Sequence, residues 1–381
     1  MLMPAGGHVF ADRLTSTTFP FQLSEDLIVV QVELNGKPFS LILDTGMPFE
    51  GAVLFGDDTV DSAGLAFSGK MLLDGVGGQP VPCEVSPGAA LKVPNLTLTD
   101  QLILVMPRDS AGRFHLEGKD GIIGLSFFAH FVVHVDYGKR LITLSEPGGP
   151  SPAEEGQRVP AKLRDNRIFV PAEVQMESGP PRPVELVLDT GNRNALVIKT
   201  GDELRQPEKT IPVQLQGLTA KISRKMGRIG SIDIGGYRLE KVLAAFTDDS
   251  TGAAPPWEKE GNLGNQILGR FDVTFDIPGG QIFLKKNGRF DEPFEFNMAG
   301  LQVERKEDRS LAIINIIPGS PADEAHLAPG DRIVMINDTP ASRMTRDAFD
   351  QVFGKDGSEV ILHVDRSGQT AKTTLKLRRI I

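Results

Sequence analysis

The feature of this sequence that most constrains its fold is an internal duplication centred on the tripeptide Asp-Thr-Gly. The tripeptide occurs at Asp44-Thr-Gly46 and again at Asp189-Thr-Gly191. Each copy follows two runs of strand-forming residues separated by turn residues, a pattern that predicts a β-hairpin. These runs are 27–34 and 39–43 in the first copy and 167–174 and 184–188 in the second. The duplication predicts two similar lobes, both mostly β.

The similarity between the copies continues downstream of the tripeptide. Each copy reaches a segment of two apolar residues and a glycine, Ile122-Ile-Gly124 in the first and Ile267-Leu-Gly269 in the second. The interval from the glycine of the tripeptide to this later glycine is 78 residues in both copies (46 to 124 and 191 to 269). A strand, an Asp-led turn and a returning strand follow each time. We interpret the matched order and spacing as duplication of a whole lobe.

Turn signals and changes of pattern divide the chain into six segments. A Pro-, Gly- and Ser-rich stretch follows the first copy and separates the lobes. After the second copy, short strands alternate with two helices, the first capped by Ser320-Pro321 and the second over 345–353. The predicted segments are 1–21, an N-terminal leader or disordered segment; 22–147, lobe one; 148–163, a linker; 164–288, lobe two; 289–298, a second linker; and 299–381, the C-terminal domain.

The two aspartates are the candidate catalytic residues. A pseudo-two-fold axis between duplicated lobes would bring Asp44 and Asp189 together. Two carboxylates about 3 Å apart cannot both ionise, so they share one proton. The ionised member then acts as general base on a water, and the protonated member polarises a scissile carbonyl. The competing interpretation is two surface turns that share a tripeptide, since Asp and Gly are favoured in turns.

The residues that follow each aspartate fit the same site. The hydroxyls of Thr45 and Thr190 are expected to hydrogen-bond across the lobe interface and to fix the two loops. Gly46 and Gly191 permit a tight turn and a close approach of substrate backbone.

These motifs resemble the pepsin/retropepsin-like aspartic peptidases, in particular the bacterial type that carries both lobes on one chain. The resemblance covers residues 22–288. It implies a bilobal double β-barrel with pseudo-two-fold symmetry, and an endopeptidase that needs no metal or cofactor. It also implies that the apolar-apolar-Gly segments support the Asp loops. A Gly-rich hairpin resembles the family's flap, with an ordinary turn as the alternative; its residues are Asp74, Gly75, Val76, Gly77 and Gly78.

The sequence departs from the family pattern directly after each tripeptide. The family usually has Ala, Ser or Thr there, whereas this chain has Met47 in one lobe and Asn192 in the other. Both residues are predicted to line the substrate cleft. The departures leave an alternative function open, namely a non-catalytic peptide-binding or adaptor protein with a degenerate protease body that acts through its C-terminal domain.

Residues 299–381 resemble a PDZ domain of the type attached to bacterial proteases. Gly319-Ser-Pro-Ala322 and Pro329-Gly-Asp331 match the motifs of that domain. Its carboxylate-binding loop corresponds to Gly300, Leu301, Gln302 and Val303. The resemblance implies capture of protein C-termini or extended peptides by β-augmentation. The alternative is a purely structural domain that docks on the lobes.

Composition limits the other partners. The net charge of −9 and the pI near 5.3 argue against nucleic acid as a partner, which usually requires a basic footprint. Cys83 is the only cysteine, so no intramolecular disulfide can form. We expect no integral membrane segment, and a monomer, because one chain carries both halves of the site. Val9-Phe10-Ala11 has the small-residue pattern of a signal-peptidase site and favours a periplasmic or secreted protein, the alternative being a cytoplasmic one.

Overall fold

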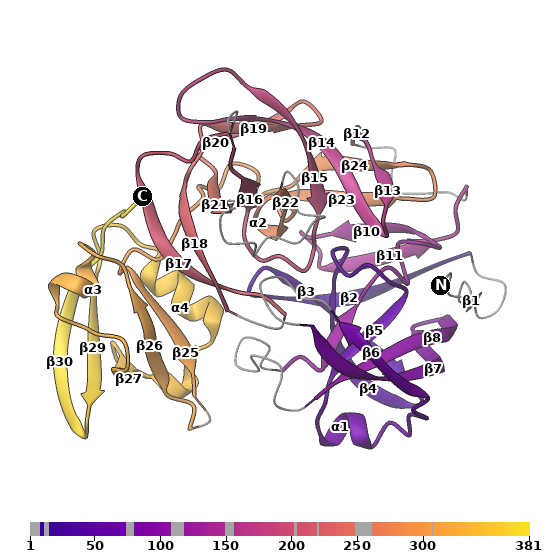
Figure 1. Cartoon of the computed structure of the whole chain (residues 1–381), viewed down its shortest axis with the longest axis horizontal. Coiled ribbons are helices and arrows are strands. Elements are labelled where there is room, and N and C mark those ends of the chain that lie inside the picture. The colour runs from indigo at the N-terminus through magenta and orange to yellow at the C-terminus, as the bar shows by residue number, and fades with distance from the viewer. Residues whose placement is uncertain are drawn as a thin grey trace.

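The computed structural model of the chain describes residues 8–10, 15–73, 80–107, 118–148, 156–201, 204–218, 221–247, 261–306 and 308–381. Within these ranges the fold is mostly β, as predicted, with three sheets of 14, 10 and 6 strands. Two lobes lie side by side, and the C-terminal part forms a smaller third body against the second lobe (Figure 1).

Lobe one contains most of the 14-stranded sheet. Its central strands follow the order β3-β4-β9-β5-β8-β7-β6. Their bounds are β3 Leu27–Leu34, β4 Lys37–Leu43, β5 Gly51–Phe55, β6 Gly69–Leu73, β7 Val81–Val93, β8 Leu96–Met106 and β9 Gly121–Ile123. The flanking elements are β1 His8–Phe10, β2 Ser16–Ser24, β10 Val132–Asp136, β11 Leu141–Ser145 and the short helix α1 Asp58–Asp61.

Lobe two repeats this arrangement. Its 10-stranded sheet runs in the order β17-β18-β21-β16-β22-β15-β14-β19-β20. The strands are β13 Lys162–Arg164, β14 Arg167–Gln175, β15 Arg182–Leu188, β16 Leu196–Lys199, β17 Thr210–Gln216, β18 Lys221–Arg228, β19 Ser231–Ile234, β20 Tyr237–Glu240, β21 Leu243–Thr247 and β22 Gly261–Leu263. The helix α2 covers Asn265–Leu268. β15 pairs in parallel with β22 as β4 pairs with β9, so the predicted duplication is confirmed in three dimensions.

A shared sheet joins the lobes at the pseudo-two-fold axis. β12 Gln157–Pro160, β23 Phe271–Asp276 and β24 Gln281–Lys286 of lobe two continue the sheet of lobe one. The contact is the antiparallel pairing of β10 with β23, in which His134 lies opposite Thr274. Their side chains also hydrogen-bond at 2.8 Å, and the rings of Phe128 and Phe275 pack edge to face beneath them. One hydrophobic core therefore runs through both lobes.

Three of the predicted boundaries differ from the structure. The predicted first linker, 148–163, contains β12, and Val159 of this strand lies in the core of the lobes. β2 begins at Ser16, inside the predicted N-terminal segment 1–21, and its residues alternate between buried and exposed positions as a half-buried strand requires. The predicted second linker, 289–298, contributes Phe290 and Phe294 to the core of the lobes.

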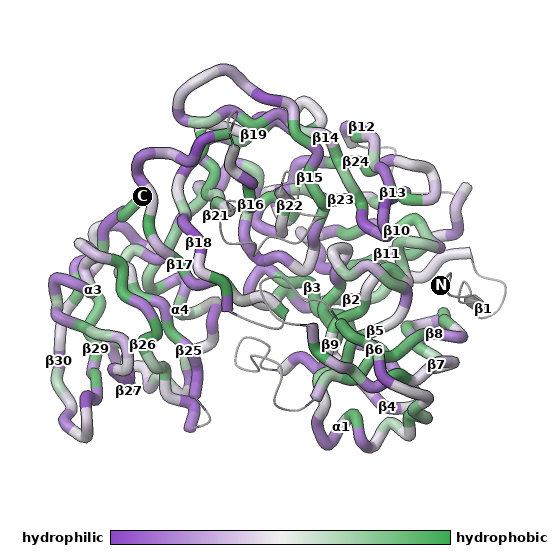
Figure 2. Tube along the Cα trace, viewed as in Figure 1, coloured by the Kyte–Doolittle hydropathy of each residue, from purple (hydrophilic) through white to green (hydrophobic). Residues whose placement is uncertain are grey.

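Hydropathy follows the fold, since the strands around β5 and β9 are mostly hydrophobic (Figure 2).

The C-terminal domain is β-rich with two α-helices, as predicted, and its sheet has six strands. Its strands are β25 Leu301–Arg305, β26 Leu311–Ile316, β27 Arg332–Ile336, β28 Thr339–Pro340, β29 Glu359–Arg366 and β30 Gln369–Lys376. The helices are α3 Pro321–Glu324, the 3-10 turn η5 Ala341–Arg343 and α4 Arg346–Phe353. Ser320 and Thr345 cap α3 and α4 with their hydroxyl oxygens.

Candidate active site at the lobe interface

The two Asp-Thr-Gly loops leave equivalent strands at the lobe interface. Asp44 follows the end of β4, and its N–H donates to the carbonyl of Ile123 in the parallel strand β9 at 2.9 Å. Asp189 follows the end of β15, and its N–H donates to Leu263 in β22 at 3.0 Å. The backbone of each aspartate is therefore hydrogen-bonded to the parallel strand beside it, which fixes where its side chain starts.

The two threonines cross-link the loops, as the sequence predicts. Thr45 Oγ1 donates to the carbonyl of Leu188 at 2.6 Å, and Thr190 Oγ1 donates to that of Leu43 at 2.7 Å. Each hydroxyl also accepts the backbone N–H of the other threonine at 3.0 Å. Both residues are fully buried. This reciprocal set fixes the loops relative to each other and satisfies buried backbone groups that water cannot reach.

Each glycine of the two loops lies against the carboxylate of the opposite lobe. A Cβ atom added to Gly46 would lie 2.7 Å from Oδ1 of Asp189, and one added to Gly191 would lie 2.3 Å from Cγ of Asp44. Each glycine N–H donates to the carboxylate of its own loop, at 2.7 Å to Asp44 and 3.0 Å to Asp189. Only glycine fits here, because each loop passes against the aspartate of the opposite lobe.

Burial is the main influence on the ionisation of Asp44. Burial raises the pKa of the Asp44 carboxyl. Hydrogen bonds from the Gly46 N–H and with the Asp189 side chain oppose this effect. Because desolvation disfavours the charged form, the protonated state of Asp44 is favoured relative to an exposed aspartate.

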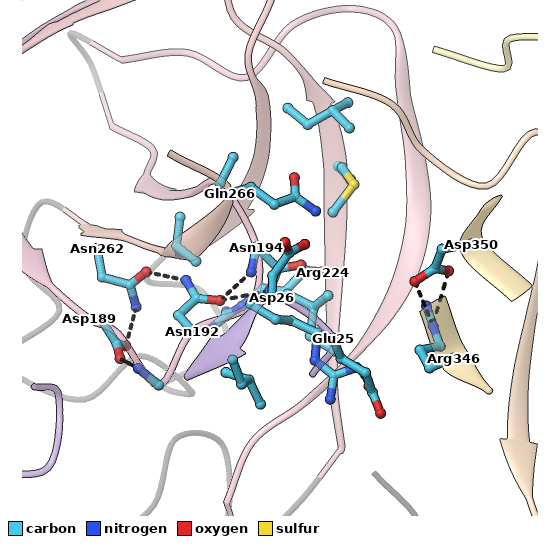
Figure 3. Close-up of a pocket in the computed structure, with 18 of the residues that line it drawn as sticks. Glu25, Asp26, Asp189, Asn192, Asn194, Arg224, Asn262, Gln266, Arg346 and Asp350 are labelled. Atoms are coloured by element: carbon cyan, nitrogen blue, oxygen red, sulfur yellow. Dashed lines mark hydrogen bonds and ion pairs between the residues drawn. The ribbon is translucent and has the colours of Figure 1, made fainter. Parts of the chain in front are cut away.

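The residues flanking the dyad differ between the lobes. In lobe one, Met47 packs with Ile122 of β9 in an apolar cluster. In lobe two, Asn192 Nδ2 donates to Oδ1 of Asn262 in β22 at 2.6 Å, and Asn262 Nδ2 donates to Oδ2 of Asp189 at 3.4 Å (Figure 3). In each lobe the residue after the tripeptide therefore has the same character as its neighbour on the adjacent strand. Both residues are apolar beside Asp44, and both are polar beside Asp189.

One predicted element is wrong. The support strand in lobe two is β22, Gly261–Leu263, which is followed by Gly264, and not Ile267-Leu-Gly269. Ile267 lies in α2 and packs in the core. The apolar pattern did not reveal β22 because Asn262 occupies the position of Ile122. Asn262 is thus a site residue that sequence reasoning missed, and the equal 78-residue interval was a coincidence.

A cavity of about 570 Å³ opens above the dyad. The predicted flap residues, Asp74 to Gly78, lie outside the described part of the chain. The strands β6 and β7 that precede and follow them pair as a hairpin, with Leu73 opposite Val81. The equivalent hairpin of lobe two, β17–β18, lines the cavity, and Leu218 beyond β17 packs against the cluster around Met47 in lobe one.

Charged residues surround the cavity. Glu25 of lobe one pairs with Arg193 of lobe two, and Asp26 lies 3.5 Å from Arg289. Arg167, which corresponds to Leu27 in the first copy, also lines the cavity. Burial lowers the pKa of its guanidinium, and the charges of Asp189 and Asp44 act in the opposite direction. These ionic residues carried no recognisable motif in the sequence.

The predicted carboxylate-binding loop opens β25 at the far end of the same cavity. Leu301, Gln302 and Val303 line the cavity, and Gly300 has a φ of 73°, which favours glycine. Leu301 and Val303 are buried in the core of the domain.

Cys83 is buried, and burial raises the pKa of its thiol to about 11, which agrees with a structural role. Within the described ranges, no group of three or more His, Cys, Asp or Glu side chains is arranged to hold a metal ion. In the same ranges, none of the helices has the length and apolar character needed to cross a membrane.

Comparison with known proteins agrees with the two-part organisation. Residues 30–127 match the aspartyl protease family, and residues 284–365 match the PDZ domain family. An aspartic proteinase from Irpex lacteus aligns in structure with 73% of this chain and 99% of its own, with a TM-score of 0.47 and 13% identity. The two family matches show that the chain combines an aspartyl-protease-like domain with a PDZ domain.

Two curated relatives come from Bacillus subtilis (strain 168). The carboxy-terminal processing protease CtpA is 37% identical over 82 residues, which is 21% of this chain and 17% of that protein. The carboxy-terminal processing protease CtpB is 24% identical over 143 residues, or 37% of this chain and 30% of that protein. The matched part thus spans less than a third of either relative.

Proposed function

We propose that this chain is an aspartic-type endopeptidase that hydrolyses peptide bonds with a water activated between Asp44 and Asp189. The observation that carries the proposal is the reciprocal set of hydrogen bonds between Thr45 and Thr190. A fixed loop pair holds the carboxylates in one geometry, and preorganised groups are what hydrolysis by general acid–base catalysis requires.

The surroundings of the dyad favour one arrangement of the proton. Burial and the apolar pair Met47–Ile122 favour protonated Asp44, and the amide of Asn262 favours ionised Asp189. In this state Asp189 takes a proton from the water as it attacks the scissile carbonyl. Asp44 donates a hydrogen bond to the carbonyl oxygen as negative charge develops there. The proton taken from the water is then delivered to the leaving amine, and the dyad returns to its starting state.

The proposed substrates are extended peptides or unfolded segments of proteins. The lining of the cavity includes residues of both lobes and of the PDZ domain, which suits a chain rather than a compact ligand. That domain recruits substrate by strand addition and takes no part in the chemistry. One chain carries both aspartates, so the active form is a monomer. Specific activity that stays constant on dilution would agree with this.

The test is hydrolysis of a peptide library by the wild type and by Asp44→Asn and Asp189→Asn, with the products sequenced. Each variant is expected to lose activity to the background level, because an amide cannot act as base or acid. Asp338→Asn, at an exposed position of the PDZ domain, is the matched control. Substantial activity in either site variant would overturn the paired-carboxylate mechanism. Tight binding of a statine-type transition-state mimic separates an enzyme from an adaptor with an eroded site.

A further inference from the structure

The strand β17 forms an edge of the lobe-two sheet, and the PDZ domain covers that edge. Among the described strands, β17 has a single sheet neighbour, β18. The backbone N–H of Gln214 in β17 donates to Oε1 of Gln302 at 2.9 Å, and Nε2 of Gln302 donates back to the carbonyl of Gln214 at 3.0 Å. Two residues earlier, the carbonyl of Pro212 accepts from Nδ2 of Asn315 at 3.3 Å. Side chains of the PDZ domain thus take the place of a neighbouring strand.

The two PDZ side chains that cover β17 also support each other. Gln302 of β25 and Asn315 of β26 lie opposite each other in the PDZ sheet, and Nδ2 of Asn315 donates to Oε1 of Gln302 at 2.9 Å. The neighbours of Gln302 on either side in β25 are buried in the PDZ core, so alternation along the strand turns Gln302 towards lobe two. Glu304, on the same face of β25, pairs with Lys221 of β18 at 3.1 Å. These bonds hold the amide of Gln302 in one orientation.

An apolar contact accompanies the polar ones. Ile317, which follows β26, is buried in a cluster with Ile211 and Val213 of β17 and with residues of β16, β18 and β21. The PDZ domain therefore holds β17 both by its backbone edge and by side chains of one face. Figure 1 shows β17 and β18 between the PDZ domain and the rest of lobe two.

The other end of the same hairpin reaches the catalytic loops. Leu218, just beyond β17, packs against the lobe-one cluster that contains Met47 and Ile122 beside Asp44. Gln214 and Leu218 both line the cavity above the dyad. The hairpin β17–β18 therefore extends along the cavity from the PDZ domain to lobe one. An edge strand without a partner on its outer side would be free to move away from the cavity, and the PDZ contacts oppose that movement.

From these contacts we infer that Gln302 and Asn315 are positioning residues of the proposed peptidase, which hold the hairpin β17–β18 against a peptide bound in the cleft. The inference rests on the proposed function for the statement that the bound peptide is cleaved. The hairpin contacts the peptide to the same extent before and during cleavage. Its position therefore determines how tightly the cleft binds the peptide, and leaves the rate of the chemical step unchanged.

The test compares three variants of the full chain. Gln302→Leu removes both bonds to Gln214 at similar side-chain volume, and Asn315→Ala removes the bond to Pro212. Asn315 is not among the described residues that line the cavity, so its replacement removes no direct contact with the peptide. Gln369→Leu, at an exposed position of β30, is the matched control.

Two quantities are measured on each variant. The first is the pair kcat and KM for a peptide of about six residues with both ends blocked, which spans about 20 Å when extended. The second is the rate of amide hydrogen exchange in the segment 210–216. Thermal melting checks that each variant is folded. The split between kcat and KM separates positioning from folding, because a partly unfolded enzyme loses kcat at constant KM, whereas loss of binding that is equal in both states raises KM alone.

Gln302→Leu is expected to raise KM about tenfold, the size expected from two neutral hydrogen bonds, and to leave kcat within about twofold of the wild type. Asn315→Ala should raise KM about threefold. In both variants the segment 210–216 should exchange faster than in the wild type. Gln369→Leu should change neither the kinetics nor the exchange.

Three results would overturn the inference. The first is a KM that neither Gln302→Leu nor Asn315→Ala changes. The second is a fall in kcat at constant KM, which would mean that the contacts only keep the chain folded. The third is a rise in KM without faster exchange in the hairpin, which would assign the effect to something other than its position.

The proposed function fails separately. If the wild type hydrolyses no peptide, the dissociation constant of the same peptide is measured on chains that carry Asp44→Asn. A dissociation constant that Gln302→Leu raises about tenfold would then leave the positioning inference standing without the catalytic proposal. An unchanged dissociation constant would overturn the inference as well.

Discussion

The side chain of Asn192 donates a hydrogen bond of 2.6 Å to Asn262, which in turn donates to Asp189 at 3.4 Å. The equivalent positions in lobe one hold Met47 and Ile122, which pack as an apolar pair. The two lobes thus have the same backbone arrangement around their aspartates but different side chains beside them. A symmetric pair of carboxylates would leave the proton equally on either, so the asymmetry of the neighbours decides which aspartate is ionised.

Replacing Asn262 by Ile removes the donor beside Asp189. We expect kcat to fall and the acid limb of the pH profile to move to higher pH by less than about one unit, because a hydrogen bond to the charged form is worth about 1 kcal/mol. The double variant Asn192→Met with Asn262→Ile reproduces the packing of lobe one. It should recover thermal stability without recovering the acid limb. A pH profile that does not move would mean that Asn262 has only a structural role.

The crossed threonine bonds predict a large effect on stability. Thr45→Val removes the bond to Leu188 and leaves the N–H of Thr190 without its acceptor, and Thr190→Val does the same in the other direction. Each is expected to lower the free energy of unfolding by about 3 kcal/mol, since buried groups lose their partners. Thr→Ser at either position keeps the hydroxyl and should cost much less. Urea unfolding measures both, and equal losses for Val and Ser would contradict the prediction.

The raised pKa of Asp44 predicts a stability that depends on pH. A carboxyl that binds its proton more tightly when folded contributes stability below the unfolded value, about 3.9, and loses this contribution as the pH rises through the folded value. Asp44→Asn should therefore unfold at a higher temperature than the wild type at pH 7, and the difference should shrink towards pH 3.

Asp331 of the PDZ domain is a control, because its contribution to stability should depend on pH in the opposite direction to that of Asp44. A hydrogen bond from Arg366 holds the pKa of its carboxyl below the usual range. Asp331→Asn should therefore destabilise the chain at pH 7, and the deficit should fade as the pH drops below the unfolded value, about 3.9, towards the lower folded value. Melting curves from pH 3 to 7 on both variants give the comparison. If both variants shifted the melting temperature at pH 7 in the same direction, the effect assigned to the burial of Asp44 or to the pairing of Asp331 would be wrong.

The segment after lobe two is part of the protease core. The guanidinium of Arg270 is buried, donates to the carbonyls of Arg289 and Phe290 at 3.2 and 3.1 Å, and lies 3.7 Å from the ring centre of Phe294. A chain that ends at Gly288 leaves this cation without most of its partners. We expect it to lose about 3–5 kcal/mol relative to a chain that ends at Asn297. Thermal melting and cleavage of a short peptide test this; equal melting temperatures for the two truncations would contradict it.

The sequence alone determined the repeated parts of this protein. The hairpins, the Asp-Thr-Gly loops with Thr45 and Thr190, and the two helices of the PDZ domain follow from alternation, turn residues and caps. These are local signals, and each is complete within about ten residues. The duplication then placed Asp44 against Asp189, because two copies of one lobe pack about an axis.

The tertiary structure decided the contacts that no local pattern encodes. Asn262 broke the apolar pattern of β22, and only its position between Asn192 and Asp189 explains an amide in a buried strand. The pairing of Gln302 with Gln214 joins residues 88 apart in the chain. A polar side chain has many possible partners in a sequence. Which one it meets depends on how the lobes and the PDZ domain pack, because a buried hydrogen bond forms only where both groups have lost water together.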